Sequence, residues 1–238
     1  MTIDFSFLEQ IFQFGLRSLN WVYPPVCAGC GTLGANWCPH CAASVSQIRE
    51  NFCPVCGRYT LDGRTCRKCQ LNNPAYDSLK SWGLFQGPLR KAIHSIKYKR
   101  NITLGYELAQ PLIKIFSDTK WDIQLITPVP LGIARLFERG YNQSALLAKP
   151  IALKKKIPYA PDCLHRVRET SSQVNMSVAE RQANVADAFK GVGKLVANNN
   201  ILVIDDVTTS GATLNACATA LRNAGANKVY CLTLAQAR

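Results

Sequence analysis

The chain has 238 residues, of which 47% are hydrophobic and 18% charged, a composition that supports a packed core and excludes an intrinsically disordered chain. No apolar run approaches the roughly 18 residues that a membrane-spanning helix needs, so we predict no membrane span and a cytoplasmic location. The formal net charge of +13 favours an anionic partner, either a phosphorylated small molecule or a nucleic acid. A solvated lysine-rich surface is the alternative explanation of this charge.

Residues 1–22 are predicted to form an amphipathic helix. Apolar side chains recur at helical spacing from Phe5 to Leu16. The segment carries Asp4 and Glu9, has no basic start and lacks a small-residue cleavage site, which argues against a signal peptide.

Residues 23–70 are predicted to form a double zinc-binding module, because eight of the eleven cysteines lie there as four Cys-x-x-Cys pairs. The two sulfurs of such a pair point to one centre, and two pairs complete a closed tetrahedral site for a structural Zn²⁺ ion. Disulfides are the alternative, but they are typical of small secreted domains. The predicted metal ligands are Cys27, Cys30, Cys38, Cys41, Cys53, Cys56, Cys66 and Cys69.

We expect two zinc ions with a sequential grouping, the first four cysteines on one ion and the last four on the other; an interleaved grouping is the alternative. The module has too few apolar residues for a core, so zinc would hold its fold. Each four-thiolate site carries a charge of −2, which lowers the formal charge of the chain from +13 to about +9.

Beyond a turn-rich linker at residues 70–78, strand and helix patterns alternate in a predicted domain of residues 79–238. This alternation predicts an α/β fold with a mainly parallel sheet covered by helices on both faces. Pro150 is expected to kink or end its helix. The expected strands are 78–85, 121–131, 201–207 and 228–237, and the expected helices are 87–100, 103–116, 141–155, 177–185 and 212–225.

The segment Ile201–Thr213, ILVIDDVTTSGAT, is the strongest functional signal. A buried strand ends in Asp205 and Asp206, whose carboxylates suit sugar hydroxyls or a hydrated divalent cation. The hydroxyl-rich turn that follows leads into a helix, whose N-terminus favours an anion. The segment therefore offers sites for a sugar diol and a phosphate a few residues apart. A capped helix without a ligand is the structural alternative.

Other phosphate-binding motifs are absent. The chain has no GxGxxG fingerprint, and Gly191–Lys194 resembles the end of a P-loop only in part, because Ala188 and Leu195 stand where the motif needs glycine and a hydroxyl residue.

Ile201–Thr213 resembles the phosphoribosyl-pyrophosphate (PRPP) motif of type I phosphoribosyltransferases. The resemblance implies a phosphoribosyltransferase-like parallel sheet, with Asp205 and Asp206 on the ribose hydroxyls, the loop from Thr209 to Thr213 on the 5-phosphate, and Mg²⁺ bound with the pyrophosphate. The predicted PRPP-binding residues are Asp205, Asp206, Thr208, Thr209, Ser210, Gly211, Ala212 and Thr213.

Residues 20–236 are similar to the competence protein F (ComF) family. The segments that carry the similarity are the cysteine pairs, LKSWGLFQGPLRKAIHSIKYK, ITPVPL, ERGYNQSALLAK, RVRETSSQ and SVAERQANVADAF. The resemblance implies a zinc-binding head, a phosphoribosyltransferase-like domain and a role in bacterial DNA uptake. Its implied partners are PRPP, single-stranded DNA, and a competence helicase or recombination mediator.

Further residues are candidates for the leaving pyrophosphate. Arg139 stands beside a loop glycine, an aromatic residue and two amides, a combination that can bind a phosphate and a planar group. The family resemblance adds the loop Pro128, Val129 and Pro130, and also Lys97. The polar stretch from Arg166 to Gln173 is expected to form a mobile hood over the site, and Arg181, further along, is a separate candidate.

Residues 90–100 hold five cations around Tyr98 and predict a helix with one apolar and one basic face. The basic face is either solvated or tracks a nucleic-acid backbone, with the tyrosine stacking on a base.

Two functions stay open at this point. The first is a PRPP-binding, phosphoribosyltransferase-like protein that acts in DNA uptake. The second is an active phosphoribosyltransferase of nucleotide or amine metabolism with no nucleic-acid role. No residue pattern marks an acceptor for the phosphoribosyl group.

Overall fold

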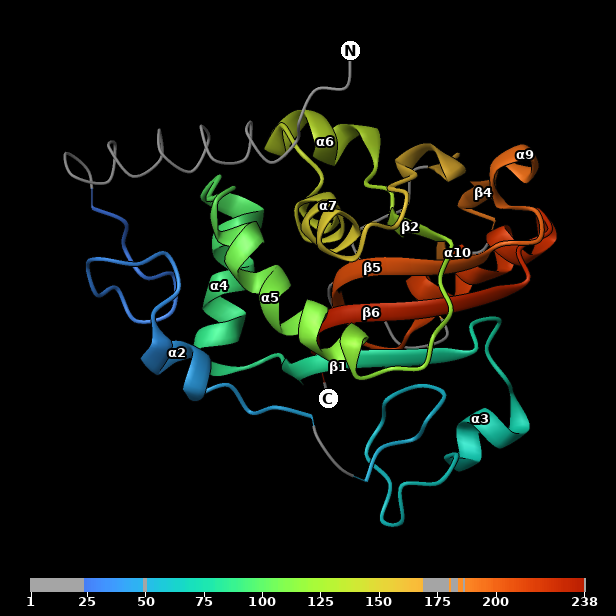
Figure 1. Cartoon of the computed structure of the whole chain (residues 1–238), viewed down its shortest axis with the longest axis horizontal. Coiled ribbons are helices and arrows are strands. Elements are labelled where there is room, and N and C mark those ends of the chain that lie inside the picture. The colour runs from blue at the N-terminus through green and yellow to red at the C-terminus, as the bar shows by residue number, and fades with distance from the viewer. Residues whose placement is uncertain (1–23, 49–50, 169–179, 181–183, 186, 238) are drawn as a thin grey trace.

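The computed structural model describes residues 24–48, 51–168, 180, 184–185 and 187–237 (Figure 1). The predicted helix over residues 1–22 lies outside the described residues, as do Arg181 and residues 169–173 of the predicted hood.

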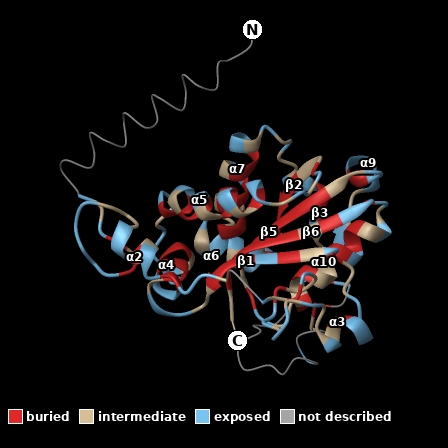
Figure 2. Cartoon of the chain, turned by 60° about the horizontal axis from the view of Figure 1, so that its bottom comes forward, coloured by how far each residue is buried: buried red, intermediate tan, exposed pale blue. Residues whose placement is uncertain are grey.

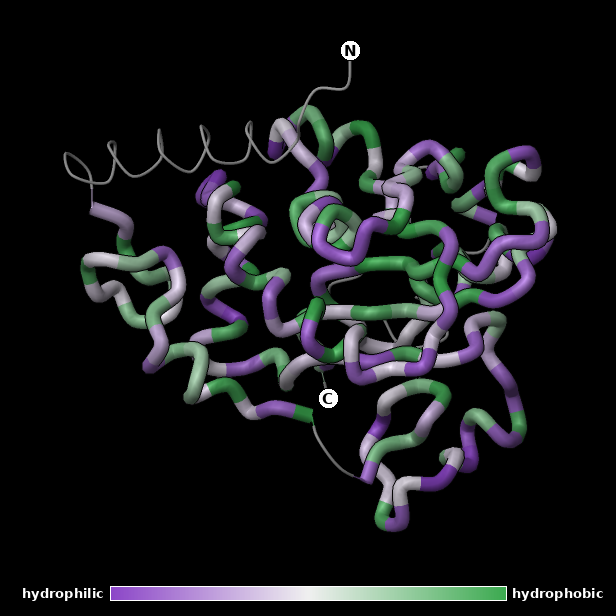
Figure 3. Tube along the Cα trace, in the orientation of Figure 1, coloured by the Kyte–Doolittle hydropathy of each residue, from purple (hydrophilic) through white to green (hydrophobic). Residues whose placement is uncertain are grey.

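A four-stranded, fully parallel sheet forms the centre of the molecule, in the order β1-β6-β5-β2. Its strands are β1 (Ser78–Leu84), β2 (Leu125–Pro128), β5 (Asn200–Thr208) and β6 (Lys228–Gln236). Strand β5 occupies an inner position, and its run Ile201–Ile204 is fully buried. Hydrophobic residues are concentrated along β5 and β6 in Figure 3, as expected for parallel strands covered on both faces.

Helices cover both faces of the sheet, and each face has its own apolar core (Figure 2). Leu202 and Ile204 pack on one face with α4, α5 and α7, whereas Ile201 and Val203 pack on the other with α10. This is the α/β fold that the strand and helix alternation predicts. The helices are α4 (Gly87–Tyr98), α5 (Leu104–Ser117), α6 (Ile133–Arg139), α7 (Gln143–Lys155), α9 (Gly193–Val196) and α10 (Ala212–Asn223).

The structure differs from the predicted elements in four places. Strand β2 is shorter than the expected 121–131, and α7 continues through Pro150 to Lys155, because packing of α7 against α5 and the sheet outweighs the missing hydrogen bond. The short helix α6 was not predicted. Nor was the two-stranded antiparallel sheet of β3 (Leu164–Arg166) and β4 (Phe189–Gly191), which follows the 3₁₀ turn η1 (Pro161–Cys163).

The cysteine module divides into two units with short helices, α2 (Pro39–Ala43) and α3 (Arg67–Leu71). The first unit, residues 27–41, packs on β1 and α5: Trp37 meets Trp82 of β1 edge to face, and Asn36 Nδ2 donates to Glu107 Oε1 of α5 at 3.1 Å. The second unit, residues 53–69, lies on strand β1 at the opposite side in Figure 1.

The module also covers the open edge of β1. The amide of Leu79 donates to the carbonyl of Val55 at 2.7 Å, and the amide of Ile48 donates to the carbonyl of Trp82 at 3.0 Å. Unpaired edge strands invite aggregation, so the cysteine module also protects the sheet edge.

Within the part of the chain that the structure describes, no helix combines the length and the apolar character required to cross a membrane.

Candidate functional site

Asp205 and Asp206, hereafter the acid pair, lie near the carboxyl end of β5. Ligands of open α/β sheets bind outside the carboxyl ends of the strands. Both aspartates are buried, with 9% and 5% of their surface exposed. Buried carboxylates are costly unless other groups compensate them, so their neighbours are informative.

Two hydrogen bonds hold Asp205. Its Oδ1 accepts from the Ser144 hydroxyl at 2.7 Å and from the backbone amide of Asp206 at 2.9 Å. Ser144 is fully buried in the first turn of α7, and Asn142 caps that helix by accepting from the Ser144 amide at 3.0 Å. The start of α7 therefore fixes the orientation of this carboxylate.

Asp206 has a cation as its main partner. Its Oδ2 lies 2.5 Å from Lys97 Nζ, near the end of α4, and accepts no aligned hydrogen bond from the described residues. Its Oδ1 accepts from Gln143 Nε2 at 3.4 Å. The acid pair is thus a partly neutralised site with acceptor capacity left for ligand hydroxyl groups.

The two carboxyl groups have opposite pKa shifts. Burial, together with the neighbouring Asp206, raises the pKa of Asp205 to about 7. Burial also acts on Asp206, but the neighbouring charge of Lys97 outweighs it, so the pKa of Asp206 lies below its ordinary value. Near neutral pH, Asp206 is ionised and Asp205 titrates.

Residues 209–213, hereafter the phosphate loop because the sequence predicts a phosphate there, run from the end of β5 into the first turn of α10. Thr209 is exposed, whereas Ser210, Gly211 and Thr213 are half-buried. Gly211 has φ +81° and precedes α10 without a side-chain cap, while the Ala212 amide donates to Ser210 Oγ at 3.3 Å. The loop thus brings its hydroxyl groups and the start of α10 to the carboxyl end of β5, and the anion site expected there stays a prediction. Thr208 belongs to β5 and is buried.

Residues 128–130, hereafter the proline loop, lie beside the acid pair, because β2 is the neighbour of β5 and Pro128 pairs with Ile204. The amide of Val129 donates to the Ile204 carbonyl at 2.9 Å, and its carbonyl accepts from Asn142 Nδ2 at 2.9 Å. Both Pro128 and Val129 are buried, and Pro130 is half-buried. The loop is therefore tied to β5 and to the start of α7.

Arg139 joins this cluster from the last residue of α6. Its Nη1 donates to Gln143 Oε1 at 2.9 Å, and its guanidinium carbon lies 5.3 Å from the centre of the Tyr98 ring. Its buried Nε has no hydrogen-bond partner among the described residues. Lys97 and Arg139 thus both reach Asp206, the first directly and the second through Gln143.

Gln143 and Ser144 are the residues that sequence reasoning missed as site residues. The sequence indicates Gln143 only as one of the two amides near Arg139, and it indicates Ser144 only as part of the expected helix 141–155. The usable signal was their position right after Arg139-Gly140, where a new helix begins and side chains point toward a strand end.

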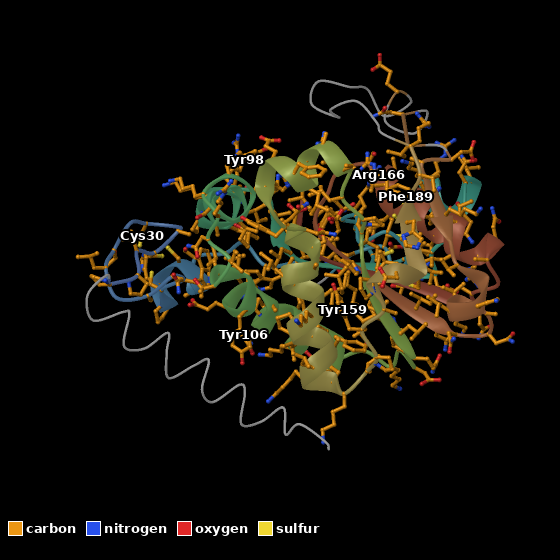
Figure 4. The ribbon with its side chains drawn as sticks, turned by 90° about the horizontal axis from the view of Figure 1, so that it is seen from above. Cys30, Tyr98, Tyr106, Tyr159, Arg166 and Phe189 are labelled. Atoms are coloured by element: carbon orange, nitrogen blue, oxygen red, sulfur yellow. The ribbon has the colours of Figure 1, made fainter. Side chains whose placement is uncertain are left out.

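Arg166, predicted as part of a hood, belongs to β3. Its guanidinium lies 5.6 Å from the centre of the Phe189 ring on β4. Figure 4 labels both residues.

The eight cysteines gather in two sequential tetrads, Cys27, Cys30, Cys38 and Cys41, then Cys53, Cys56, Cys66 and Cys69. Within each tetrad all sulfurs lie within 4.8 Å of one another. The backbone amides of Cys38 and Cys66 donate to Cys27 Sγ and Cys53 Sγ, each at 3.4 Å. Four converging sulfurs that accept amide hydrogens fit a structural, tetrahedral Zn²⁺ ion.

A groove of about 990 Å³, hereafter the α4 groove, separates the first cysteine unit from α4. Gly29 and Cys30 line one wall, and Arg90, Lys91 and His94 line the other, with Lys99 at the helix end. Among its lining residues there is no aspartate or glutamate. Figure 4 marks Cys30 and Tyr98 on this side of the molecule.

Comparisons with known proteins agree with this architecture. The model of the double zinc ribbon domain matches residues 18–70, and the model of the phosphoribosyl transferase domain matches residues 104–238. The second match covers more than half of the chain.

Three relatives match this chain over most of their own length. The DNA utilization protein YhgH of Salmonella typhimurium is 32% identical over 203 residues, covering 82% of this chain and 88% of that protein. Competence protein F of Haemophilus influenzae is 28% identical, covering 84% and 96%. Competence protein ComFC of Bacillus subtilis is 25% identical, covering 79% and 78%. The chain therefore belongs to the competence protein F family, which joins a double zinc ribbon to a phosphoribosyl transferase domain.

Proposed function

We propose that the chain binds PRPP at the carboxyl end of β5 and that this binding serves the use of DNA, the activity for which its relatives are named. The observation that carries the PRPP proposal is the buried acid pair between the phosphate loop and two cations, Lys97 and Arg139. The proposal matches each part of the ligand to a group of this site.

The acid pair accepts hydrogen bonds from the two ribose hydroxyls. The phosphate loop and the N-terminus of α10 receive the 5-phosphate, because helix N-termini favour anions. The pyrophosphate lies toward Lys97, Arg139 and the proline loop. Carboxylate oxygens are also ligands that Mg²⁺ takes, and the ion would reduce the charge of the pyrophosphate.

Isothermal titration calorimetry with PRPP in Mg²⁺ buffer tests this proposal. We expect binding by the natural protein and a loss of at least about tenfold in affinity for Asp205→Asn/Asp206→Asn, because hydrogen bonds to ionised groups contribute about 1.5–3 kcal/mol each. Asp118→Asn, an exposed carboxylate at the end of α5, is the matched control. Equal PRPP affinity of the double variant and the natural protein would disprove the site.

The nucleic-acid part of the proposal rests on the α4 groove. Three cations and His94 line it without a carboxylate, and the His94 ring lies between those of Phe85, which precedes α4, and Tyr98, with ring centres 6.1 and 5.6 Å apart. Cations beside stacking surfaces are typical of proteins that bind single-stranded nucleic acid. We propose that single-stranded DNA follows this groove.

Fluorescence anisotropy with a labelled single-stranded oligonucleotide tests the groove proposal. We expect binding whose affinity falls steeply as salt rises, because backbone contacts release counterions. No binding at low salt would contradict it.

A pyrophosphate-release assay separates the DNA proposal from the metabolic alternative. Turnover of PRPP with free nitrogenous bases or amines, together with no DNA binding, would favour a phosphoribosyltransferase of nucleotide or amine metabolism.

A further inference from the structure

We propose that Lys97 is a specificity-determining residue of the acid pair. It disfavours ligands that bring only a ribose, and it admits ligands that also carry an anion able to replace Asp206 as the partner of Lys97. The inference rests on the proposed PRPP site and adds its selection rule. It explains why the carboxylate assigned to a sugar hydroxyl is paired with a cation from α4.

The first step concerns the Lys97–Asp206 contact. Lys97 Nζ lies 2.5 Å from Asp206 Oδ2, and the side chains of Lys97 and Asp206 are only 21% and 7% exposed. A ligand hydroxyl that takes this oxygen as its acceptor competes with the ammonium group. Removing a cation from a buried carboxylate is unfavourable, and a neutral hydroxyl does not replace the lost charge.

The second step concerns the anion that the Lys97 ammonium group binds once it leaves Asp206. A pyrophosphate beside the acid pair offers the ammonium a new anion, so the lysine exchanges one charged partner for another. Arg139 supports this exchange, because its Nε has no hydrogen-bond partner among the described residues and its Nη1 binds Gln143, which itself donates to Asp206. A ligand without this anion receives no such compensation.

The third step concerns the direction of approach. Lys97 reaches the acid pair from the face that α4, α5 and α7 cover, whereas the phosphate loop leads into α10 on the opposite face. A 5-phosphate in the phosphate loop is therefore supplied from the other face and does not replace Asp206 as the partner of Lys97. Ribose 5-phosphate and PRPP differ in the one group that Lys97 needs.

The test compares the affinities of PRPP and ribose 5-phosphate for the natural protein and Lys97→Met, by calorimetry in Mg²⁺ buffer. We expect the natural protein to prefer PRPP. In Lys97→Met the PRPP affinity should fall and the ribose 5-phosphate affinity should rise, reducing the preference at least tenfold. Lys114→Met, which removes an exposed charge in the last turn of α5, is the matched control and should keep the preference.

Two further variants make the result decisive. Lys97→Arg keeps the cation and should keep most of the preference. In an Asp206→Asn background, adding Lys97→Met should no longer raise the affinity for ribose 5-phosphate, because no ion pair is left to remove.

The failures of the two proposals are distinguishable. If the natural protein binds PRPP but Lys97→Met weakens both ligands by the same factor, or changes neither, the role of Lys97 as a selector is disproved and the PRPP site stands. If the natural protein binds neither ligand, the proposed function fails and this inference fails with it.

Discussion

The acid pair and the α4 groove share one helix but differ in how their charges are held. At the acid pair, a buried carboxylate and a largely buried lysine near the end of α4 neutralise each other. In the groove, Arg90, Lys91 and Lys99 are exposed, and no carboxylate lines the wall among the described residues. Buried, paired groups select a ligand by geometry, whereas exposed cations attract any polyanion and are screened by salt.

The difference predicts two binding activities that respond to different changes. Ligand binding at the acid pair should depend on pH and local backbone shape and hardly on zinc. Binding in the groove should depend on zinc and salt.

Removal of zinc should have the largest effect. Structural zinc sites contribute on the order of 10 kcal/mol to folding, and the cysteine units have little apolar core of their own. With a zinc-selective chelator we expect two ions released per chain, loss of single-stranded DNA binding, and retained PRPP binding. Metal analysis, anisotropy and calorimetry measure these three quantities.

Single substitutions assign this effect to one unit. Cys41→Ser should abolish DNA binding, because the first unit forms a wall of the groove. Cys69→Ser in the second unit is the control and should leave it unchanged. Loss of PRPP binding upon chelation would show that the two regions are not independent.

The next largest effect is expected from Gly211→Ala, which changes the backbone of the phosphate loop beside the acid pair. At φ +81° an L-residue costs about 1–2 kcal/mol, and a Cβ at this position would meet the Tyr76 hydroxyl at 3.2 Å. We expect a lower free energy of unfolding in urea and a lower PRPP affinity.

Gly34→Ala is the control for backbone strain, since Gly34 has φ +106° and open space around it. It should lower the free energy of unfolding but keep the PRPP affinity. A Gly211→Ala protein with natural PRPP affinity would contradict the proposed phosphate loop.

The acid pair should also make PRPP binding depend on pH. Asp205 has a pKa raised to about 7, and its ionised form accepts stronger hydrogen bonds from a ribose hydroxyl than the protonated acid does. Affinity should therefore fall about tenfold from pH 8 to pH 6 for one such group. Asp205→Asn should bind more weakly throughout, and its affinity should vary only as the phosphates of the ligand titrate.

The same group affects stability with a definite sign. Folded Asp205 holds its proton up to about pH 7, whereas an unfolded aspartate loses it near about pH 4. The folded state therefore binds more protons in this range, and Asp205 lowers the free energy of unfolding as pH rises from about 4 to about 7. In Asp205→Asn this part of the pH dependence should disappear from urea titrations.

The smallest expected effect comes from the groove cations. Arg90→Gln/Lys91→Gln should weaken DNA binding several-fold and reduce the slope of log affinity against log salt by about 0.7 for each lost phosphate contact. PRPP affinity should not change. Lys149→Gln/Lys154→Gln on α7 removes the same charge from exposed positions and is the control. An unchanged slope in Arg90→Gln/Lys91→Gln would place the DNA elsewhere.

Local patterns predicted a large part of this molecule. The Cys-x-x-Cys spacing predicts the ligands of each zinc site, because neighbouring residues in a tight turn need no distant partner. The apolar run Ile201–Ile204 predicts a strand buried on both faces, and the acid pair follows it directly. The helical spacing of apolar residues, with glycine or proline at helix ends, also predicted α4, α5, α7 and α10.

Other features escaped sequence reasoning because they depend on packing. The short helix α6 has no buried residue, so it carries no apolar pattern of a core helix. Pro150 suggested a helix end, yet packing of α7 against α5 and the sheet carries the helix through it. The β3–β4 strands are three residues each, too short for a clear alternation.

The sequence by itself determined the four cysteine pairs, the central strand and the carboxylates at its end, because each lies within one short stretch of chain, whereas the grouping of the pairs into two tetrads came from the structure. Only the tertiary structure decided what surrounds those carboxylates. Ser144 and Gln143 lie 61 and 63 residues before their partners, and Lys97 comes from a third element. Parallel strands whose carboxyl ends meet at one edge, with α4 and α7 packed on one face, bring these groups together.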